Sequence, residues 1–451
     1  MRIQLSDHFT YNRLYRFVLP TIIMMVFTSV YGIVDGLFVS NYVGKLPFAS
    51  LNLIYPLIMI LGSVGFMLGT GGNAVVSKTL GEGDREKANK VFSMLVYVTI
   101  VFGVALALFG IAFTRPVAEW LCAGEKEMSA AARAEMVEYC VLYGRIILAA
   151  LPAFMLQNAF QGFFVTAEKP RLGLFVIVAA GVTNIVLDAI FVAVFEWGLA
   201  GAAIATAMSQ FIGGVIPLFY FARKNDSLLR LCKTRYDGKT LLAVCINGSS
   251  ELLSNISASL VTILYNAQLM AFAGVNGVSA YGIIMYASFT FAAIYIGYSI
   301  GSAPIVGYNY GAQNHGEMKN VFKKSVISML GFGVAMMSLA LALSNVLAGI
   351  FVGYDEVLFE MTAHGFRVYS VSFLICGINI FASSFFTALG NGLISALISA
   401  LRVVFQIVNV LILPVFFELE GIWYSIIVAE ILSVIVSAIF LFIKRKKYNY
   451  A

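Results

Sequence analysis

The chain has 451 residues, of which 60% are hydrophobic and only 12% are charged, and its mean hydropathy is +0.90. This composition excludes an ordinary soluble domain and is typical of a chain that crosses a membrane many times. The formal net charge of +6 does not indicate nucleic-acid binding. The basic residues gather in short segments between apolar runs, as membrane topology requires.

Apolar runs of about 20 residues, long enough to cross a hydrocarbon core of roughly 30 Å, recur along the chain. Strands of a membrane barrel would be shorter and would alternate apolar with polar residues, so the runs predict helices. We expect an all-α integral membrane fold with about twelve transmembrane helices. Their predicted ranges are 14–40, 50–77, 92–114, 137–166, 171–195, 198–221, 241–272, 277–307, 322–351, 362–389, 393–416 and 420–443.

Lys and Arg predict the orientation. If the amino terminus is cytoplasmic, the inner segments hold most of the basic residues, including the tail "KRKK". The outer loops then hold only Lys45, Arg115, Lys126 and Arg133. This asymmetry places both termini in the cytoplasm, which agrees with an even number of spans.

Several site types have no support in the sequence. The five cysteines contain no CxxC pair, and the three histidines are widely scattered, so neither a His metal site nor a catalytic triad is indicated. The glycine-rich "LGTGGN" at 68–73 lacks the GK[ST] ending of a phosphate loop and predicts close helix packing. We therefore expect a protein that is not an enzyme and needs no cofactor.

The basic segment 223–239 divides the spans into two groups of six. We predict an amino-terminal lobe at 1–222, a cytoplasmic linker at 223–239 and a carboxyl-terminal lobe at 240–451. An even number of spans gives the two halves the same orientation in the membrane. Transporters built from such parallel repeats place their substrate site between the halves.

The two halves resemble one another in sequence. Segment 69–92 aligns without gaps on 299–322 at an offset of 230, which pairs Gly71 with Gly301. Later matches keep their order at offsets of 222, where Phe163 meets Phe385, and 220, where Gly201 meets Gly421. Ordered matches of this kind predict an internal duplication.

A few polar residues lie inside the predicted spans. In "TNIVLDAIF", Asn184 and Asp188 are four residues apart and share one helical face. Asp35 lies in the first span, with Thr28 and Tyr31 on its face as candidates for the lining of a substrate cavity. Because a charged side chain at the bilayer centre costs about 2.5–3.5 kcal/mol on insertion scales, such acids are usually functional. The alternative is that each acid hydrogen-bonds to a neighbouring helix for packing.

Two carboxylates that face one dry cavity repel each other, which favours a proton on one of them. With oxygens from Asn184 and Thr206, the same set could instead hold Na⁺. At the offset of 230, Asp35 faces Tyr265, so the second half has no equivalent acid. Acids that occur in one half alone are a poor fit to a symmetrical scaffold role.

Several motifs resemble those of the multidrug and toxic compound extrusion (MATE) family, and of its DinF-related prokaryotic branch in particular. They are "YGIVDGLFVSNYVG", "LGEGDREKANK", "YGRIILAALP", "TNIVLDAIF", "GLAGAAIAT" and, as the most specific, "GSAPIVGYNYGAQNHGEMK". The resemblance covers nearly the whole chain. It implies a V of two six-helix lobes around a central cavity, and export of cationic or amphipathic organic compounds against inflow of protons or sodium.

The resemblance also suggests a cation-coupling site in the amino-terminal lobe. Asp35, Asn184, Asp188 and Thr206 follow the spacing of that branch's site, and Pro20 stands fifteen residues before Asp35. The other lobe departs from the family pattern. Glu251 is similar to an acidic position of NorM-like members, but the tenth span offers Asn379 and no carboxylate. A sodium site in that lobe is therefore not implied.

Other residues keep two interpretations. Pro20 removes a backbone hydrogen bond and is either a hinge that responds to Asp35 or a purely structural kink. Glu251 either contacts substrate or cation or makes a structural hydrogen bond. Met270, Met285 and Phe289 face lipid or pack by default, although flexible Met and flat aromatic side chains also suit a cavity for varied ligands.

Arg402 and Glu430 lie deep in the last two spans, and we expect them to form an ion pair.

Taken together, the sequence predicts a cation-coupled antiporter, with H⁺ or Na⁺ as coupling ion, in the plasma membrane of a prokaryote. Its expected partners are small organic cations or amphipaths and membrane lipids, and we expect a monomer. A lipid-linked oligosaccharide flippase of the same superfamily is the alternative, but it would favour an Arg-rich cavity and extra spans. A passive channel or a receptor is a further alternative.

Overall fold

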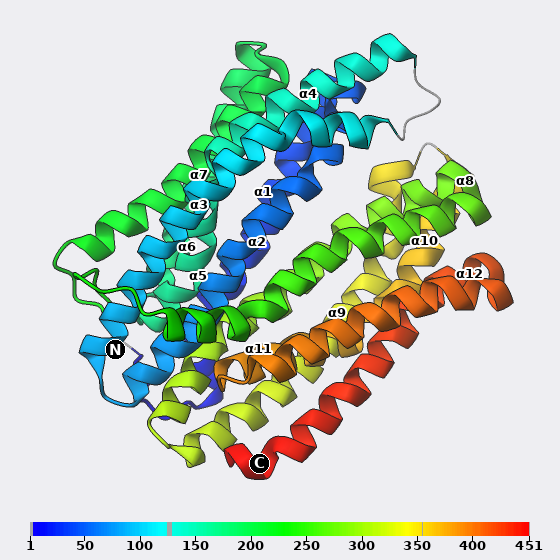
Figure 1. Ribbon diagram of the computed structural model, residues 1–451. Coiled ribbons are helices and arrows are strands. Elements are labelled where there is room, and N and C mark those ends of the chain that lie inside the picture. Colours follow the sequence, from blue (N-terminus) through cyan, green and yellow to red (C-terminus); the bar gives the residue numbers. More distant parts are fainter. Residues whose placement is uncertain (1–2, 124–128, 354, 451) are drawn as a thin grey trace. The chain divides into compact units, whose positions relative to one another are not determined.

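The computed structural model describes residues 3–123, 129–353 and 355–450, and all regular structure within these ranges is helical (Figure 1). One predicted outer-loop cation, Lys126, lies outside the described residues. The elements are α1 (Tyr11–Phe38), η1 (Val39–Val43), α2 (Lys45–Gly81), α3 (Arg85–Cys122), α4 (Ala130–Ala149), α5 (Leu151–Thr166), α6 (Pro170–Asp188), η2 (Ala189–Val194), α7 (Gly198–Ala222), α8 (Gly238–Gly311), α9 (His315–Val352), α10 (Glu356–Ser370), α11 (Phe373–Ala388) and α12 (Gly392–Tyr448).

The helices account for the predicted spans. In the described part of the chain, eight helices are long and apolar enough to cross a membrane, and two bent pairs raise the number to ten. The bends are 54° between α4 and α5 and 51° between α10 and α11. Two long helices are each divided by one non-helical residue, Gly274 in α8 and Glu418 in α12. Both breaks fall where the sequence predicts them, so the expectation of twelve spans is confirmed.

The predicted duplication is visible in the helix bounds. α3 and α9 begin and end at positions 230 residues apart, and α5 and α11 begin and end 222 residues apart. The N-caps repeat as well. Asp84 accepts a hydrogen bond from the Lys87 backbone N–H over 2.9 Å, and Asn314 accepts one from the Glu317 N–H over 3.1 Å. Such caps satisfy backbone donors that a helix start leaves unpaired.

The turn after the first helix of each half is equivalent too. Gly44 (φ 114°, ψ 174°) separates η1 from α2, and Gly274 (φ 60°, ψ −150°) divides α8. Both backbones lie in regions that residues with a Cβ atom avoid. Glycine at these two positions therefore fixes the sharp connection between the first two spans of each half.

By contact density the chain divides into two compact units. Unit 1 comprises residues 1–26, 77–83 and 249–451, and unit 2 comprises residues 27–76 and 84–248. Helices α1, α2 and α8 contribute residues to both units. The lobe boundaries drawn from the linker 223–239 stay a prediction.

Each unit has an aromatic core at the repeat-related place. In unit 2 the rings of Phe92 and Phe163 lie 4.9 Å apart between centroids, and in unit 1 the rings of Phe322 and Phe385 lie 5.0 Å apart. Edge-on and offset ring pairs of this kind add about 0.5–1.5 kcal/mol beyond their buried area. These rings hold α3 against α5 and α9 against α11.

The glycine-rich stretch of α2 serves close packing, as predicted. A Cβ atom built on Gly71 would overlap the Val244 carbonyl oxygen of α8, and one built on Gly248 would overlap the Met67 carbonyl oxygen of α2. The two backbones therefore approach so closely that only glycine fits on either side. The phosphate-loop alternative for "LGTGGN" has no support, because these residues are the interior of a helix.

Gly248→Ala should destabilise the protein, because its Cβ would meet backbone atoms that cannot move aside cheaply. We expect a loss of about 1–3 kcal/mol, as for other overpacked sites, seen as a lower midpoint in thermal unfolding of the detergent-solubilised protein. Gly282→Ala in the same helix is the matched control, since a Cβ there meets nothing within 4 Å. Equal midpoints for the two variants would contradict the proposed close crossing.

Candidate functional site

Each predicted coupling acid lies beside a stretch of π-helix. Asp188 is the last residue of α6 and η2 follows it, while Asp35 stands four residues before η1 begins. Wide backbone turns close both segments: the N–H of Gly44 donates to the Val39 carbonyl over 3.3 Å, and that of Phe195 to the Ile190 carbonyl over 2.8 Å. Such turns are rare and frequent at functional sites. Sequence reasoning missed them because no residue pattern marks a π-turn.

The structure brings the four predicted coupling residues together within unit 2. The Asn184 amide donates to the Thr206 hydroxyl over 3.4 Å, and that hydroxyl donates to the Asp35 carboxylate, also over 3.4 Å. The Asp188 carboxyl group faces that of Asp35 at hydrogen-bonding range. Helices α1, α6 and α7 therefore meet at one polar point, although the role of these residues in coupling stays a prediction.

A small residue lets α6 approach α1. At Gly181, seven residues before Asp188, an added Cβ would lie 2.5 Å from the ring of Phe27 and 2.9 Å from that of Tyr31. The Phe27 and Tyr31 rings also contact each other, with centroids 5.9 Å apart. This packing places Tyr31 beside α6, close to the acids. Thr28 and Tyr31 lie in the same unit as the coupling set, and their place in a substrate cavity stays a prediction.

Asp188 is the least satisfied polar group of the site. Its side chain has no exposed surface, and neither carboxylate oxygen accepts a hydrogen bond from a donor among the described residues. When both acids are ionised, neither can donate a proton to the other. A buried carboxylate without a donor or a cation costs several kcal/mol. A proton shared by the pair would remove this cost.

The donor set also suits a monovalent metal cation. It offers carboxylate oxygens from Asp35 and Asp188 and neutral oxygens from Asn184 and Thr206, all of them hard ligands of the kind that Na⁺ prefers. Among the described residues, no group of three or more His, Cys, Asp and Glu side chains could hold a metal ion. Two carboxyl groups with neutral oxygens beside them could take up a proton or a monovalent cation, and the choice between these stays a prediction.

One neighbour of the acids was not predicted. Tyr143 of α4 is buried, with 3% of its surface exposed, and lies close enough to interact electrostatically with both Asp35 and Asp188. No sequence pattern marks it, since it is one of 22 tyrosines and lies far along the chain from both Asp35 and Asp188.

Pro20 lies inside α1, which continues through it as one helix. Pro20 belongs to unit 1, whereas Asp35 belongs to unit 2. The hinge role of Pro20 therefore stays a prediction, and the structure adds that the helix carrying it reaches into both units.

The remaining predicted cavity residues lie on α8 and belong to unit 1, whereas the coupling set belongs to unit 2. They are Glu251, Met270, Met285 and Phe289. Met270 and Phe289 are 51% and 55% exposed, as expected of side chains that face lipid or a cavity. Their substrate contacts stay a prediction.

The second half carries different chemistry at the related helices. Tyr265, the repeat partner of Asp35, shares a hydrogen bond of 2.7 Å with Ser425. The expected ion pair is present: Arg402 contacts Glu430 through Nη2 at 2.6 Å and through Nε at 2.8 Å. The Asn379 amide donates to the same carboxylate over 2.7 Å. Glu430 is 1% exposed, so an internal guanidinium neutralises this buried acid.

Comparison with known proteins agrees with the resemblance seen in the sequence. The MatE family matches residues 20–190 and 252–412. The multidrug export protein MepA of Staphylococcus aureus strain NCTC 8325 is 25% identical over 438 residues, which are 97% of this chain and 94% of that protein. MepA of Staphylococcus saprophyticus is 24% identical over 432 residues, which are 96% of this chain and 93% of that protein.

Solved structures establish the fold. A MATE family multidrug resistance transporter of the MOP superfamily in the outward-facing conformation gives a TM-score of 0.88 at 20% identity, over 96% of each chain. A MATE in the bent conformation gives 0.87 at 20% identity, over 98% of this chain and 97% of that one. The MatE family match covers most of the sequence and both halves of the duplication. The chain therefore belongs to the MATE family and is a multi-pass membrane transporter, not an enzyme.

Proposed function

We propose that this protein is a secondary antiporter that exports cationic or amphipathic organic compounds and is driven by inflow of H⁺ or Na⁺. The observation that carries the proposal is the meeting of Asp35 and Asp188 in a buried part of unit 2. Its relatives named for multidrug export support the substrate class and do not favour the flippase alternative.

Coupling follows from charge. A proton or Na⁺ at the acids neutralises the site, whereas a bound organic cation favours the ionised acids. Each ligand then weakens the binding of the other, and linkage makes this effect reciprocal. Uptake of the coupling ion on one side of the membrane would thereby release the drug on that side, without any covalent step.

We further propose that coupling is confined to the first half of the chain. In the second half, Glu430 is paired with Arg402 and hydrogen-bonded by Asn379. A guanidinium stays charged at any physiological pH, so this acid has no need of an external cation. The duplicated scaffold would thus hold one exchangeable site and one permanently neutralised site.

The membrane placement is part of the same proposal. The distribution of Lys and Arg supports cytoplasmic termini in the plasma membrane of a prokaryote. We also propose that the protein acts as a monomer.

Asp35→Asn and Asp188→Asn should each lower ethidium efflux by roughly ten-fold or more, because the coupling ion loses its charged ligand. The measurement is efflux from proteoliposomes in which proton and sodium gradients are imposed separately, which also identifies the coupling ion. Glu196→Gln is the matched control, since this exposed acid lies just beyond η2. Wild-type, gradient-dependent efflux by both Asp variants would overturn the proposal.

Ethidium binding to the purified protein should weaken as pH falls if H⁺ is the coupling ion. Protonation removes the negative charge that attracts the drug, so affinity is highest at the alkaline end of the series. With Na⁺ as coupling ion, added NaCl should weaken binding at constant pH, and choline chloride should not. Fluorescence titration measures both effects. Asp188→Asn should flatten the response, and an unchanged slope in that variant would contradict the linkage.

Arg402→Met should destabilise the protein by about 3–5 kcal/mol, because it leaves a buried carboxylate unpaired. The double variant Arg402→Gln/Glu430→Gln should recover most of this loss in thermal unfolding. Arg115→Met is the control, since the Arg115–Glu138 pair is similarly short at 2.7 Å but its side chains are 45% and 62% exposed. Its loss should stay below about 1 kcal/mol. A double variant as unstable as Arg402→Met would argue against the internal pair.

A further inference from the structure

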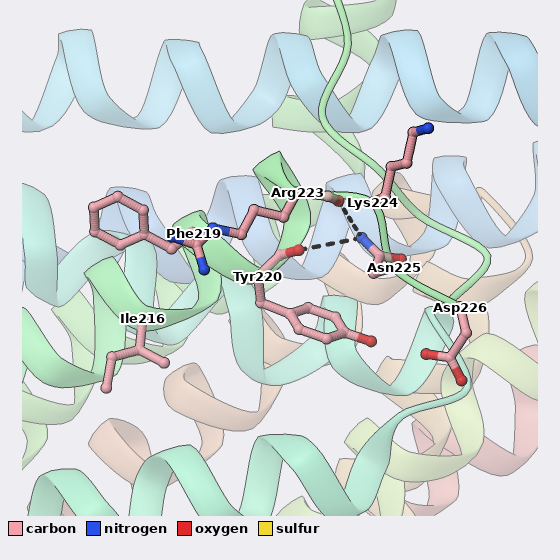
Figure 2. Close-up of a pocket in the computed structure, with 7 residues that line it drawn as sticks. All are labelled: Ile216, Phe219, Tyr220, Arg223, Lys224, Asn225 and Asp226. Atoms are coloured by element: carbon pink, nitrogen blue, oxygen red, sulfur yellow. Dashed lines mark hydrogen bonds between the residues drawn. The ribbon is translucent and has the colours of Figure 1, made fainter.

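An open pocket of about 700 Å³ lies where α7 ends and the basic linker begins, away from the coupling residues. Figure 2 shows the seven residues that line it: Ile216, Phe219, Tyr220, Arg223, Lys224, Asn225 and Asp226. All belong to unit 2. The pocket therefore joins an apolar stretch of a membrane-spanning helix to a polar turn, at the level where a span meets the membrane surface.

The end of α7 is capped by an amide, not by a cation. The Asn225 side-chain amide donates to the backbone carbonyls of Tyr220 and Arg223, each over 3.2 Å (Figure 2). Its own oxygen accepts from the Ser227 N–H over 3.0 Å and from the Ser227 hydroxyl over 2.7 Å. Asn225 thus donates to carbonyl groups at the helix end to which a Lys or Arg side chain often donates. It also fixes one wall of the pocket.

The one acid of the pocket is already neutralised. Asp226 forms an ion pair with Lys169, with 2.6 Å between carboxylate oxygen and ammonium nitrogen. Lys169 immediately precedes α6. Asp226 is therefore poorly placed to neutralise the two cations of the pocket, Arg223 and Lys224.

Arg223 and Lys224 form no side-chain hydrogen bond or ion pair within the described part of the chain. Figure 2 shows the Arg223 side chain lying back along α7 beside Phe219, while the Lys224 side chain extends in another direction. Both residues line the pocket. Phe219 is 60% exposed and Ile216 is 46% exposed. In a membrane-spanning helix, such apolar side chains face acyl chains.

We propose that this pocket binds the headgroup of an anionic phospholipid. Its phosphate would be held by Arg223 and Lys224, and its acyl chains would lie along Ile216 and Phe219. The acid and the helix carbonyls that would otherwise compete for the cations are already satisfied by Lys169 and Asn225. Juxtamembrane cations attract anionic lipid strongly enough that loss of both should weaken binding roughly ten- to thirty-fold.

The test is native mass spectrometry of the purified protein titrated with phosphatidylglycerol or phosphatidylcholine. Arg223→Gln/Lys224→Gln should retain one phosphatidylglycerol fewer than the wild type and the same phosphatidylcholine. Lys233→Gln/Arg235→Gln is the matched control, because it removes the same charge from exposed side chains of the same linker, and it should bind as the wild type does. Arg223→Lys/Lys224→Arg should keep binding, which separates loss of charge from misfolding.

Three results would overturn the proposal. One is phosphatidylglycerol binding that is unchanged in Arg223→Gln/Lys224→Gln. Another is an equal loss in the control pair, which would show diffuse attraction to the whole linker. The third is full displacement of phosphatidylglycerol by inorganic phosphate at equal concentration, which would show a site for free anions in which acyl chains play no part.

Discussion

The close approach of Asp35 and Asp188 is the interaction on which the proposed coupling depends. Two carboxyl groups meet where α1, α6 and α7 converge, and Asp188 receives no hydrogen bond from a donor among the described residues. Ionised together they would repel each other in a region that cannot solvate them. The packing at Gly181 nevertheless holds α6 against α1. A fold that forces this contact favours any ligand that brings positive charge to it.

In the described part of the second half, the related helices carry no such pair of facing carboxyl groups. A Tyr265–Ser425 hydrogen bond lies at the helices related to α1 and α7, and the buried Glu430 has Arg402 as its internal partner. Both arrangements are electrically neutral without an external ion. The duplication therefore supplied two similar frames that differ in charge, and we propose that only the first of them responds to a cation. A ligand shifts a conformational equilibrium only by the difference between its affinities for the two states. A frame that is already neutral offers a cation little binding energy in either state.

The long helices connect the proposed coupling residues to the other unit of the chain. α1 carries Asp35 in unit 2 and Pro20 in unit 1, so a change at the acids acts on a helix that the other unit also holds. A missing backbone hydrogen bond at proline makes bending there less costly than elsewhere in the helix. At the far end of α7, the amide cap of Asn225 leaves two cations for the membrane surface. The predicted coupling residues and the proposed lipid pocket thus lie at separate places in unit 2.

The sequence alone determined the helical class, the number of spans and the duplication, and it predicted the four residues of the coupling set. Apolar runs of membrane length and repeated glycines are local signals, and an acid inside such a run is costly enough to stand out. Only the tertiary structure decided which side chains meet. It put Asp188 against Asp35 and showed Arg402 neutralising Glu430. It also added Tyr143 and the π-turns, and it placed Glu251, Met270, Met285 and Phe289 in the other unit. Contacts between helices distant in sequence depend on crossing angles and side-chain packing, which hydrophobic periodicity does not encode.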